Sequence, residues 1–291
     1  MKLGVTANLN RPGTEQVLGR LIRWCSKHDA ALLLSEELRE VVDSSVNLVP
    51  RDELPARSDL ILSMGGDGTL LAAARLVSDA GVPILGINVG SLGFLTEQTP
   101  QDLERTLDRL LNKDYEIEKR MVLEARITNS ESGDTNFALN DIVIGRIDIR
   151  MIKLALYSNG DYICSYAADG LVISTPTGST AYSLSVGGPI LNPEMDAIIA
   201  SPIAPHSLAS RPLVFHSDEQ LTLEIISETD EVLMTTDGQV PTPLKKGDKI
   251  LVKKANYRVS LVRFEENSFY HVLRSKLHWG FVPVSDSTDN D

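Results

Sequence analysis

A short apolar run that ends in a glycine-rich turn is the feature of this chain that most restricts its fold. Residues Leu60–Met64 are apolar at four positions of five, and Gly65-Gly66-Asp67-Gly68-Thr69 follows directly. A helical pattern of apolar residues begins at Leu70. A strand, a glycine turn and a helix bind phosphate in α/β proteins, because glycine exposes backbone N–H groups and the helix N-terminus attracts anions. The turn therefore predicts a phosphate-binding site around Gly65, Gly66, Gly68 and Thr69.

Asp67 is the acidic member of this turn. A carboxylate beside bound phosphate needs a function of its own, such as holding Mg²⁺ or accepting a proton from an attacking hydroxyl group. The structural alternative is that Asp67 caps the following helix, where aspartate is favoured. The turn matches neither G-x-G-x-x-G nor G-x-x-x-x-G-K-[ST], so neither a dehydrogenase nor a Walker A protein is supported.

Composition narrows the class of protein. The 291 residues suggest two domains, and 42% apolar residues are enough for packed cores. The net charge of -12 argues against binding of nucleic acid or an anionic membrane. No apolar run approaches the ~20 residues of a membrane span, and no signal peptide is evident. We expect a cytoplasmic protein, with Cys25 and Cys164 as buried free thiols.

Strands and helices alternate over residues 1–112, which predicts an α/β N-terminal domain with a mostly parallel sheet. A second glycine-rich loop, Asn88–Phe94, follows an expected strand over Val82–Val89. Loops at the carboxyl ends of parallel strands converge on one crevice, so this loop either joins the phosphate site or is an ordinary connection. The other strands expected here are Lys2–Ala7 and Ala30–Leu34, and a short helix is expected over Glu36–Val42.

Short β-rich runs separated by polar turns predict an all-β, sandwich-like C-terminal domain over residues 113–267. A helix over 268–280 is expected to pack back on the N-terminal domain, and residues 284–291 are expected to be a disordered tail. The expected strands are Met121–Thr128, Phe137–Ile144, Ile152–Tyr157, Tyr162–Tyr166, Leu171–Ser174, Ala197–Ile203, Leu213–Phe215, Leu221–Ile226, Val232–Thr236, Lys249–Lys253 and Tyr257–Val262.

The segment Thr175–Pro189 interrupts the β pattern with hydroxyl residues and glycine. Such a segment offers donors and acceptors to a base or ribose, and Tyr182 could stack on a ring. The alternative is a polar loop that leads into a short helix capped by Ser179. Asn140-Asp141, inside an expected strand, and Asp169-Gly170 need polar partners, either backbone groups or a ligand. Thr236–Gln239 is typical of a hairpin turn.

These motifs together resemble the bacterial NAD kinase family over nearly the whole chain and in the family's order. The resemblance implies phosphoryl transfer from ATP to the 2′-hydroxyl of the adenosine ribose of NAD, with a divalent cation, Mg²⁺ or Mn²⁺. It also implies a homodimer or homotetramer in which NAD sites borrow residues from a neighbouring subunit. The motifs are Gly65–Thr69, Asn140-Asp141, Asp169-Gly170, Thr175–Pro189, Pro205-His206-Ser207-Leu208 with Ser210-Arg211-Pro212, and Asp237-Gly238-Gln239.

The resemblance also assigns roles to residues. Asp67 would accept the proton of the 2′-hydroxyl or orient it. Asn140 and Asp141 would hold the adenosine part, and Asp169 would contact the nicotinamide end. The other residues assigned to NAD are Gly68, Arg150, Thr180, Ala181, Tyr182, Ser183, Leu184, Ser185 and Gln239. No protein residue is assigned to the metal.

Three positions depart from common members of the family. Asp141 stands where many have Glu, and Arg150 lies at a position that varies. Ala167 lies at a position linked to the choice of donor, so polyphosphate stays possible beside ATP. Two rival functions remain: a related lipid kinase, which should lack the Thr175–Pro189 segment, and a regulator that binds NAD without turnover.

Overall fold

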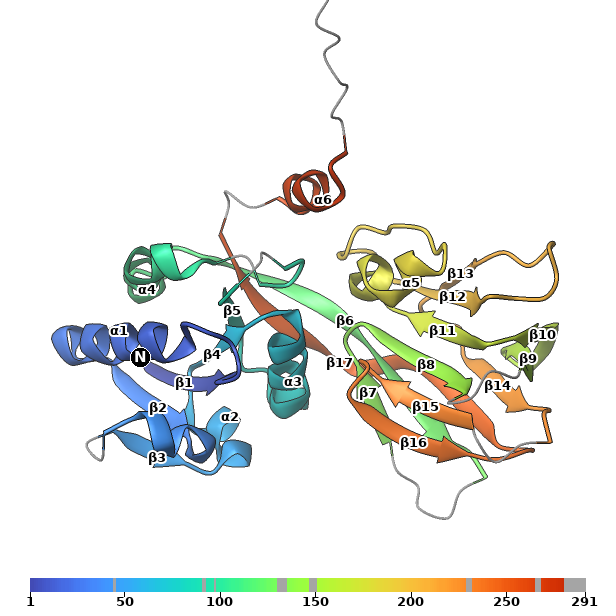
Figure 1. The fold of residues 1–291 in the computed structure, drawn as a ribbon, viewed down its shortest axis with the longest axis horizontal. Coiled ribbons are helices and arrows are strands. Elements are labelled where there is room, and N and C mark those ends of the chain that lie inside the picture. Colours follow the sequence, from blue (N-terminus) through green and yellow to red (C-terminus); the bar gives the residue numbers. More distant parts are fainter. Residues whose placement is uncertain are drawn as a thin grey trace, which may run out of the picture.

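The first five strands form a parallel sheet in the order β5–β4–β1–β2–β3, as the computed structural model in Figure 1 shows. Helices α1 and α4 cover one face, and α2 and α3 cover the other. Because both faces are covered, the central strands β4 and β5 are buried along their whole length. The elements are β1 Lys2–Ala7, α1 Thr14–His28, β2 Ala31–Ser35, a 3-10 helix Glu36–Val41, β3 Asn47–Val49, α2 Leu54–Arg57, β4 Leu60–Gly65, α3 Asp67–Val77, β5 Ile84–Asn88 and α4 Leu103–Leu111.

The structure describes residues 1–43, 46–90, 93–96, 98–129, 135–146, 151–228, 232–264 and 268–279. Arg150, the middle of the second glycine loop and the expected tail lie outside these ranges. In the described part, no helix is long and apolar enough to cross a membrane. Cys25 and Cys164 are both free thiols, as predicted, but only Cys25 is buried, and Cys164 is half-buried.

The C-terminal part consists of two antiparallel layers that enclose one apolar core, which includes Leu154, Leu171 and Met234. One layer is a six-stranded sheet in the order β13–β12–β11–β8–β15–β16, and the other contains β10, β9, β14, β17, β6 and β7. The elements are β6 Glu116–Ile127, β7 Thr135–Ala138, β8 Asp141–Arg146, β9 Ile152–Ser158, β10 Asp161–Ala168, β11 Gly170–Ser174, α5 Tyr182–Ser185, β12 Ala197–Ile203, β13 Leu213–His216, β14 Leu221–Ile225, β15 Val232–Thr236, β16 Val240–Leu244, β17 Lys249–Arg263 and α6 Phe269–Leu277.

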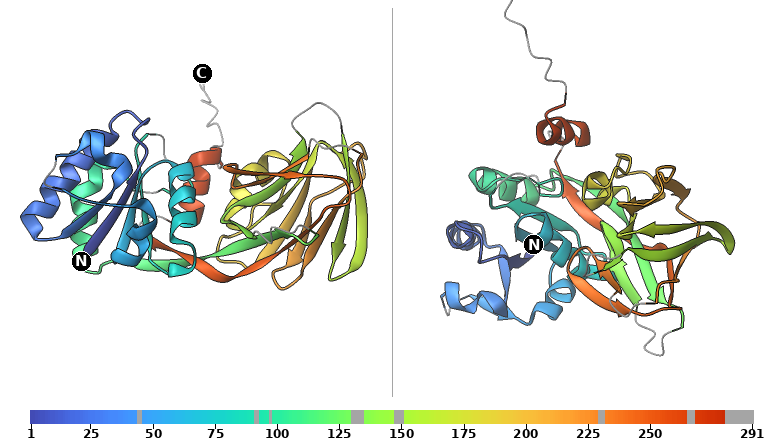
Figure 2. Two further views of the ribbon diagram at one scale, coloured as in Figure 1. Left: turned by 90° about the horizontal axis from the view of Figure 1, so that it is seen from below. Right: turned by 45° about the vertical axis from the view of Figure 1, so that its right-hand side comes forward.

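Strand β17 joins the two parts. It pairs with β14 and β6 in the C-terminal part and, at Leu261, with Ile84 of β5 in the parallel sheet. Figure 2 shows the two parts side by side, with the long strands β6 and β17 running between them. The sheet that contains β17 therefore has 11 strands and extends through both parts.

The predicted fold class, a parallel α/β part followed by an antiparallel β part, is confirmed. Two strand predictions were wrong. The expected strand Phe137–Ile144 is two strands, β7 and β8, so Asn140 lies between them rather than inside one. The expected strands Lys249–Lys253 and Tyr257–Val262 are the single strand β17, in which the pairing shifts between Lys254 and Arg258. The proposed domain boundary at residues 112 and 113 stays a prediction.

Candidate functional site

The glycine turn lies at the carboxyl end of β4, where it meets the loops that follow β1 and β5. The N–H of Asn8 donates to the Met64 carbonyl at 2.9 Å, and the N–H of Val89 donates to the Gly65 carbonyl at 2.8 Å. A Cβ at position 65 would lie 2.2 Å from Oγ1 of Thr69, so only glycine fits there. The second glycine loop thus lies beside the first, as convergence of the strand ends predicts.

Arg11, from the loop after β1, lies over both glycine loops. A Cβ at Gly66 would be 3.0 Å from Nη2 of Arg11, and one at Gly90 would be 2.9 Å from Nη1. Arg11 is exposed, and it forms no ion pair with the described residues. A guanidinium in this position is suited to bind phosphate oxygens in pairs. No motif surrounds Arg11, so sequence analysis missed it.

The carboxylate of Asp67 binds the loop after β5. Oδ2 accepts the N–H of Phe94 at 2.8 Å, and Oδ1 accepts the N–H groups of Leu95 and Thr96 and the Thr96 hydroxyl, each at 3.1 Å. A Cβ at Gly93 would be 1.9 Å from Oδ1, so glycine is required there as well. The capping alternative was wrong: Gly66 is the N-cap of α3, and Asp67 makes no capping bond.

Asp237 lies at the tip of the β15–β16 hairpin and binds the segment between β7 and β8. Its carboxylate accepts the backbone N–H groups of Asn140 at 2.8 Å, Leu139 at 3.0 Å and Asp141 at 3.2 Å. Asp237 and Gly238 both have positive φ, +50° and +64°, as tight hairpin turns favour. The predicted hairpin is confirmed, but the role of Asp237 was missed because the Asp-Gly pair is explained by the turn alone.

Asp141 and Asp237 form a buried acidic pair. Burial, and then the negative charge of Asp237, raise the pKa of Asp141 to about 7. Burial also raises the pKa of Asp237, although the three N–H groups and the charge of Arg75 oppose this. A neutral Asp141 carboxyl can donate a hydrogen bond, whereas an ionised one can only accept. Oδ1 of Asn140 is buried and has no hydrogen-bond partner among the described residues.

The Thr175–Pro189 segment packs directly on Asn140. The N–H of Thr175 donates to the Asn140 carbonyl at 2.9 Å, and its hydroxyl donates to the Leu139 carbonyl at 2.6 Å. A Cβ at Gly178 would be 2.1 Å from the same Asn140 carbonyl oxygen. The expected cap was wrong: Ala181 is the N-cap of α5, and Oγ of Ser179 instead accepts the N–H of Leu191 at 3.0 Å.

Three cavities surround this segment. The first, of about 410 Å³, is lined by Asn140, Asp141, Ala181, Tyr182, Asp237 and Gly238 among others. The second, of about 380 Å³, is lined by Asp169, Tyr182 and Arg146. Tyr182 borders both, and 42% of its surface is exposed. The structure therefore brings together Asn140, Asp141, Asp169, Ala181 and Tyr182, which sequence analysis had assigned to NAD from separate motifs.

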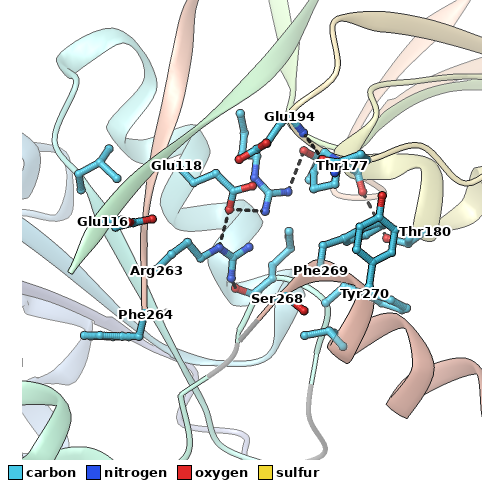
Figure 3. A pocket seen from close by; sticks show the side chains of 17 residues that line it. Glu116, Glu118, Thr177, Thr180, Glu194, Arg263, Phe264, Ser268, Phe269 and Tyr270 are labelled. Atoms are coloured by element: carbon cyan, nitrogen blue, oxygen red, sulfur yellow. Dashed lines mark hydrogen bonds and ion pairs between the residues drawn. The ribbon is translucent and has the colours of Figure 1, made fainter. Parts of the chain in front are cut away.

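The third cavity, of about 350 Å³, is lined by Thr177 and Thr180, the loop at Phe94 and the start of α6 (Figure 3). Arg120 donates to Thr177 Oγ1 at 3.2 Å and to Glu118 at 2.8 Å, and Arg263 donates to Glu118 at 2.7 Å. Burial opposes ionisation of Glu118, but the charges of Arg120 and Arg263 lower its pKa below the ordinary value. This network fixes the base of the segment to β6 and β17.

Four predicted site residues lie elsewhere. Ser183 is fully buried, with its Oγ 3.4 Å from that of Ser201. Leu184 and Ser185 complete α5 but line none of the three cavities. The Gln239 side chain binds α3: its Nε2 donates to the Gly68 carbonyl at 2.9 Å. Their contacts with NAD, and that of Arg150, stay predictions.

A phosphate-binding turn with an adjacent carboxylate, set against polar cavities, is the arrangement of a phosphotransferase that acts on a hydroxyl group. Donor phosphate at the turn and acceptor in the cavities would be bound by different parts of the fold. The class of protein is therefore a kinase.

The comparisons identify the family. The model of the ATP-NAD kinase N-terminal domain matches residues 3–115, and that of the C-terminal domain matches residues 139–264. The chain is 39% identical over 281 residues to the NAD kinase of Geotalea daltonii and 42% identical over 284 residues to that of Heliobacterium modesticaldum. Each alignment covers 96% of this chain and 99% of the relative. The chain belongs to the ATP-NAD kinase family.

Solved structures agree with this assignment. Yeast NADH kinase complexed with NADH has a TM-score of 0.89 at 26% identity, over 97% of this chain and 88% of that one. An NAD kinase from Archaeoglobus fulgidus in complex with ATP has a TM-score of 0.77 at 24% identity, over 96% of this chain and 99% of that one. The second likeness concerns the fold alone.

Proposed function

We propose that this chain transfers the γ-phosphoryl group of ATP to the 2′-hydroxyl of the adenosine ribose of NAD, giving NADP and ADP. One observation carries the proposal: the phosphate-binding turn touches the hairpin that borders the acceptor cavity, through Gln239 Nε2 and the Gly68 carbonyl at 2.9 Å. A phosphate bound at the turn and a hydroxyl group bound in the cavity therefore lie on opposite sides of the hydrogen bond between Gln239 and Gly68. Membership of the ATP-NAD kinase family supports these two substrates.

The donor phosphates bind the N-terminal part. Gly65, Gly66, Gly68 and Thr69 surround them, and the N-terminus of α3 directs its positive dipole end to the same place. Arg11 adds a positive charge over the two glycine loops. Inorganic polyphosphate offers the same chain of phosphoryl groups and remains the second possible donor.

The acceptor binds the C-terminal part. Oδ1 of Asn140, which has no hydrogen-bond partner among the described residues, accepts a hydrogen bond from the adenosine part of NAD. Asp141 contacts the same part of the ligand, either as acceptor or, when neutral, as donor. Tyr182 lies between the first and second cavities, so the dinucleotide extends past its ring toward Asp169 at the nicotinamide end.

Asp67 acts on the attacking hydroxyl. As the 2′-oxygen bonds to the γ-phosphorus, the bond from that phosphorus to the bridging oxygen of ADP breaks, and the hydroxyl proton passes to the carboxylate. Because the transition state of phosphoryl transfer is loose, orientation of the hydroxyl contributes at least as much as removal of its proton. Oδ2 accepts only one hydrogen bond among the described residues, so it is the oxygen available for this role.

The reaction needs a divalent cation, Mg²⁺ or Mn²⁺, which would neutralise charge on the donor phosphates. The described residues contain no group of three or more His, Cys, Asp or Glu side chains that could hold a metal. The described residues therefore fit an ion held mainly by the substrate phosphates and water. No protein side chain is assigned to the ion, because Oδ2 of Asp67 is already assigned to the hydroxyl group.

We further propose a cytoplasmic homodimer or homotetramer. Strand β10 is an edge of the large sheet, and its Tyr162 and Ile163 are exposed, as an intersubunit contact requires. Light scattering coupled to size-exclusion chromatography measures this state. A monomer at micromolar concentration would contradict it.

The test of the activity is NADP formation by the purified protein from NAD, with ATP or polyphosphate as donor. We expect activity with Mg²⁺ or Mn²⁺, loss of activity after EDTA and recovery when the metal is restored. NAD binding without NADP formation under any of these conditions would favour a regulator instead.

A further inference from the structure

The side chains of Arg75 and Gln239 connect the helix that carries Asp67 to the hairpin that carries Asp237. Arg75 lies in the last turn of α3, and its Nη2 donates to Oε1 of Gln239. Nε2 of the same glutamine donates to the Gly68 carbonyl at 2.9 Å, in the first turn of that helix. One glutamine therefore binds both ends of α3.

The same hairpin binds the acceptor side of the site. Asp237, two residues before Gln239, accepts the N–H groups of Leu139, Asn140 and Asp141. A continuous chain of hydrogen bonds therefore leads from α3 through the hairpin tip to Asn140 and Asp141. Among the described residues, no other side-chain hydrogen bond connects α3 and its glycine turn to the hairpin and the residues that line the NAD cavity.

Arg75 is not explained by helix formation or by apolar packing. Its Nη1 is buried and has no partner among the described residues, which costs free energy that a methionine of similar length would avoid. Its charge also acts on Asp237, as the cation that opposes the effect of burial there. A charged residue at this position is therefore better accounted for by its connection to the hairpin.

We propose that Arg75 and Gln239 are positioning residues that form an interdomain clamp, which sets the 2′-hydroxyl of bound NAD in line with the donor phosphoryl group. This inference rests on the proposed function. Transfer requires the reacting atoms to be about 3–3.5 Å apart, and a displacement of about 1 Å can cost roughly 100-fold in rate. Neither side chain needs to touch a substrate for this effect.

The clamp makes a specific kinetic prediction. Gln239→Leu removes both hydrogen bonds, and Arg75→Met removes one and the charge. We expect each to lower kcat roughly 10- to 100-fold. In Arg75→Met, which changes no residue assigned to a substrate, KM for NAD and KM for ATP should each stay within about threefold of wild type, because each substrate still binds its own part. Gln239→Glu keeps the acceptor for Arg75 but loses the donor to Gly68, so its kcat should lie between those of the wild type and Gln239→Leu.

A double variant and a control separate the clamp from loss of structure. The double variant, with both Arg75→Met and Gln239→Leu, should have a kcat little lower than that of Gln239→Leu alone, because both substitutions remove the same hydrogen-bonded link. Arg57→Met, which breaks an exposed ion pair with Glu53 on α2, should retain wild-type kcat. Thermal unfolding of every variant should show folded protein at the assay temperature.

The outcomes are distinct. Unchanged kcat in Gln239→Leu and Arg75→Met, or a rise in KM for NAD with kcat unchanged, would overturn the clamp. So would a loss of activity that simply follows the fraction of unfolded protein. If the wild type forms no NADP, the proposed function fails, and the clamp, which rests on it, fails with it.

Discussion

The carboxylate of Asp67 accepts the backbone N–H of Phe94 at 2.8 Å, although the two residues lie in loops after different strands. Together with the bonds from Leu95 and Thr96, this contact holds the second glycine loop against the first. Both oxygens of Asp67 therefore organise this loop. In the proposed function, Oδ2 has a second role, which is to accept the proton of the attacking hydroxyl group.

Replacement of Asp67 by asparagine is expected to slow turnover by about 10²–10⁴, because the proton acceptor and one orienting oxygen are lost. NAD affinity, measured by calorimetry without donor, should change little. Thr96→Val is the matched control: it removes one donor to Oδ1 and leaves the carboxylate, so its effect should be below about tenfold. Equal effects of the two variants would assign Asp67 a purely structural role.

Arg11→Met is expected to raise KM for ATP by roughly 10-fold or more, since hydrogen bonds to charged groups contribute about 1.5–3 kcal/mol. KM for NAD should stay near the wild-type value because Arg11 lies on the donor side. Arg39→Met serves as control, since Arg39 is an exposed helix residue near Glu36. Steady-state kinetics with each substrate varied in turn measures both constants, and a selective rise in KM for NAD would place Arg11 elsewhere.

Asp141→Asn is expected to change how stability depends on pH. The pKa of Asp141 is about 7 in the folded protein and near its ordinary value of 3.8 in the unfolded chain. Between these values the folded state binds more protons, so this residue's contribution is fully present below pH 4 and is lost as pH rises to 7. The slope is at most about 1.4 kcal/mol per pH unit.

Urea unfolding of wild type and Asp141→Asn from pH 4 to 7 tests this directly. The free energy of unfolding of the wild type should fall relative to the variant across that window. Two parallel curves would show that Asp141 titrates normally.

Gly178→Ala is expected to lower the free energy of unfolding by about 1–3 kcal/mol, because its Cβ would meet the Asn140 carbonyl oxygen at 2.1 Å. The shift of Asn140 should also raise KM for NAD. Gly19→Ala is the control, since a Cβ there meets only the end of Arg23 at 3.5 Å inside α1. It should stabilise the protein by about 0.5–1 kcal/mol. Chemical denaturation measures the free energy of unfolding of both variants. The same change in both would contradict the close approach of Gly178 to the Asn140 carbonyl oxygen.

Local patterns predicted much of the fold. Some elements depend mainly on residues close together in the sequence, and the structure has them at the predicted positions. They are the Gly65–Thr69 turn, the strands of the parallel sheet and the hairpin at Asp237. Strand β16 was missed because Pro241 and Pro243 argue against a strand. It tolerates them because it lies at the edge of its sheet, where some N–H groups need no partner.

The candidate site was predictable only as separate motifs. Asn140 lies between two strands because its N–H is bound by Asp237, which is 97 residues away in the sequence. Arg11 and Arg75 have ordinary surroundings in the sequence, and only the approach of distant loops gives them a role. Long-range hydrogen bonds of this kind leave no local pattern to read.

Strand β17 also bears on how the protein is made. Its Leu261 pairs with Ile84, so β5 is covered at this position by a strand that is synthesised 177 residues later. During synthesis on the ribosome, the parallel sheet would have an unpaired edge at β5 until β17 is made. Such an edge is prone to pair with other chains. The edge of β5 at Ile84 is therefore covered only after β17 emerges, which ties completion of this part of the sheet to the end of translation.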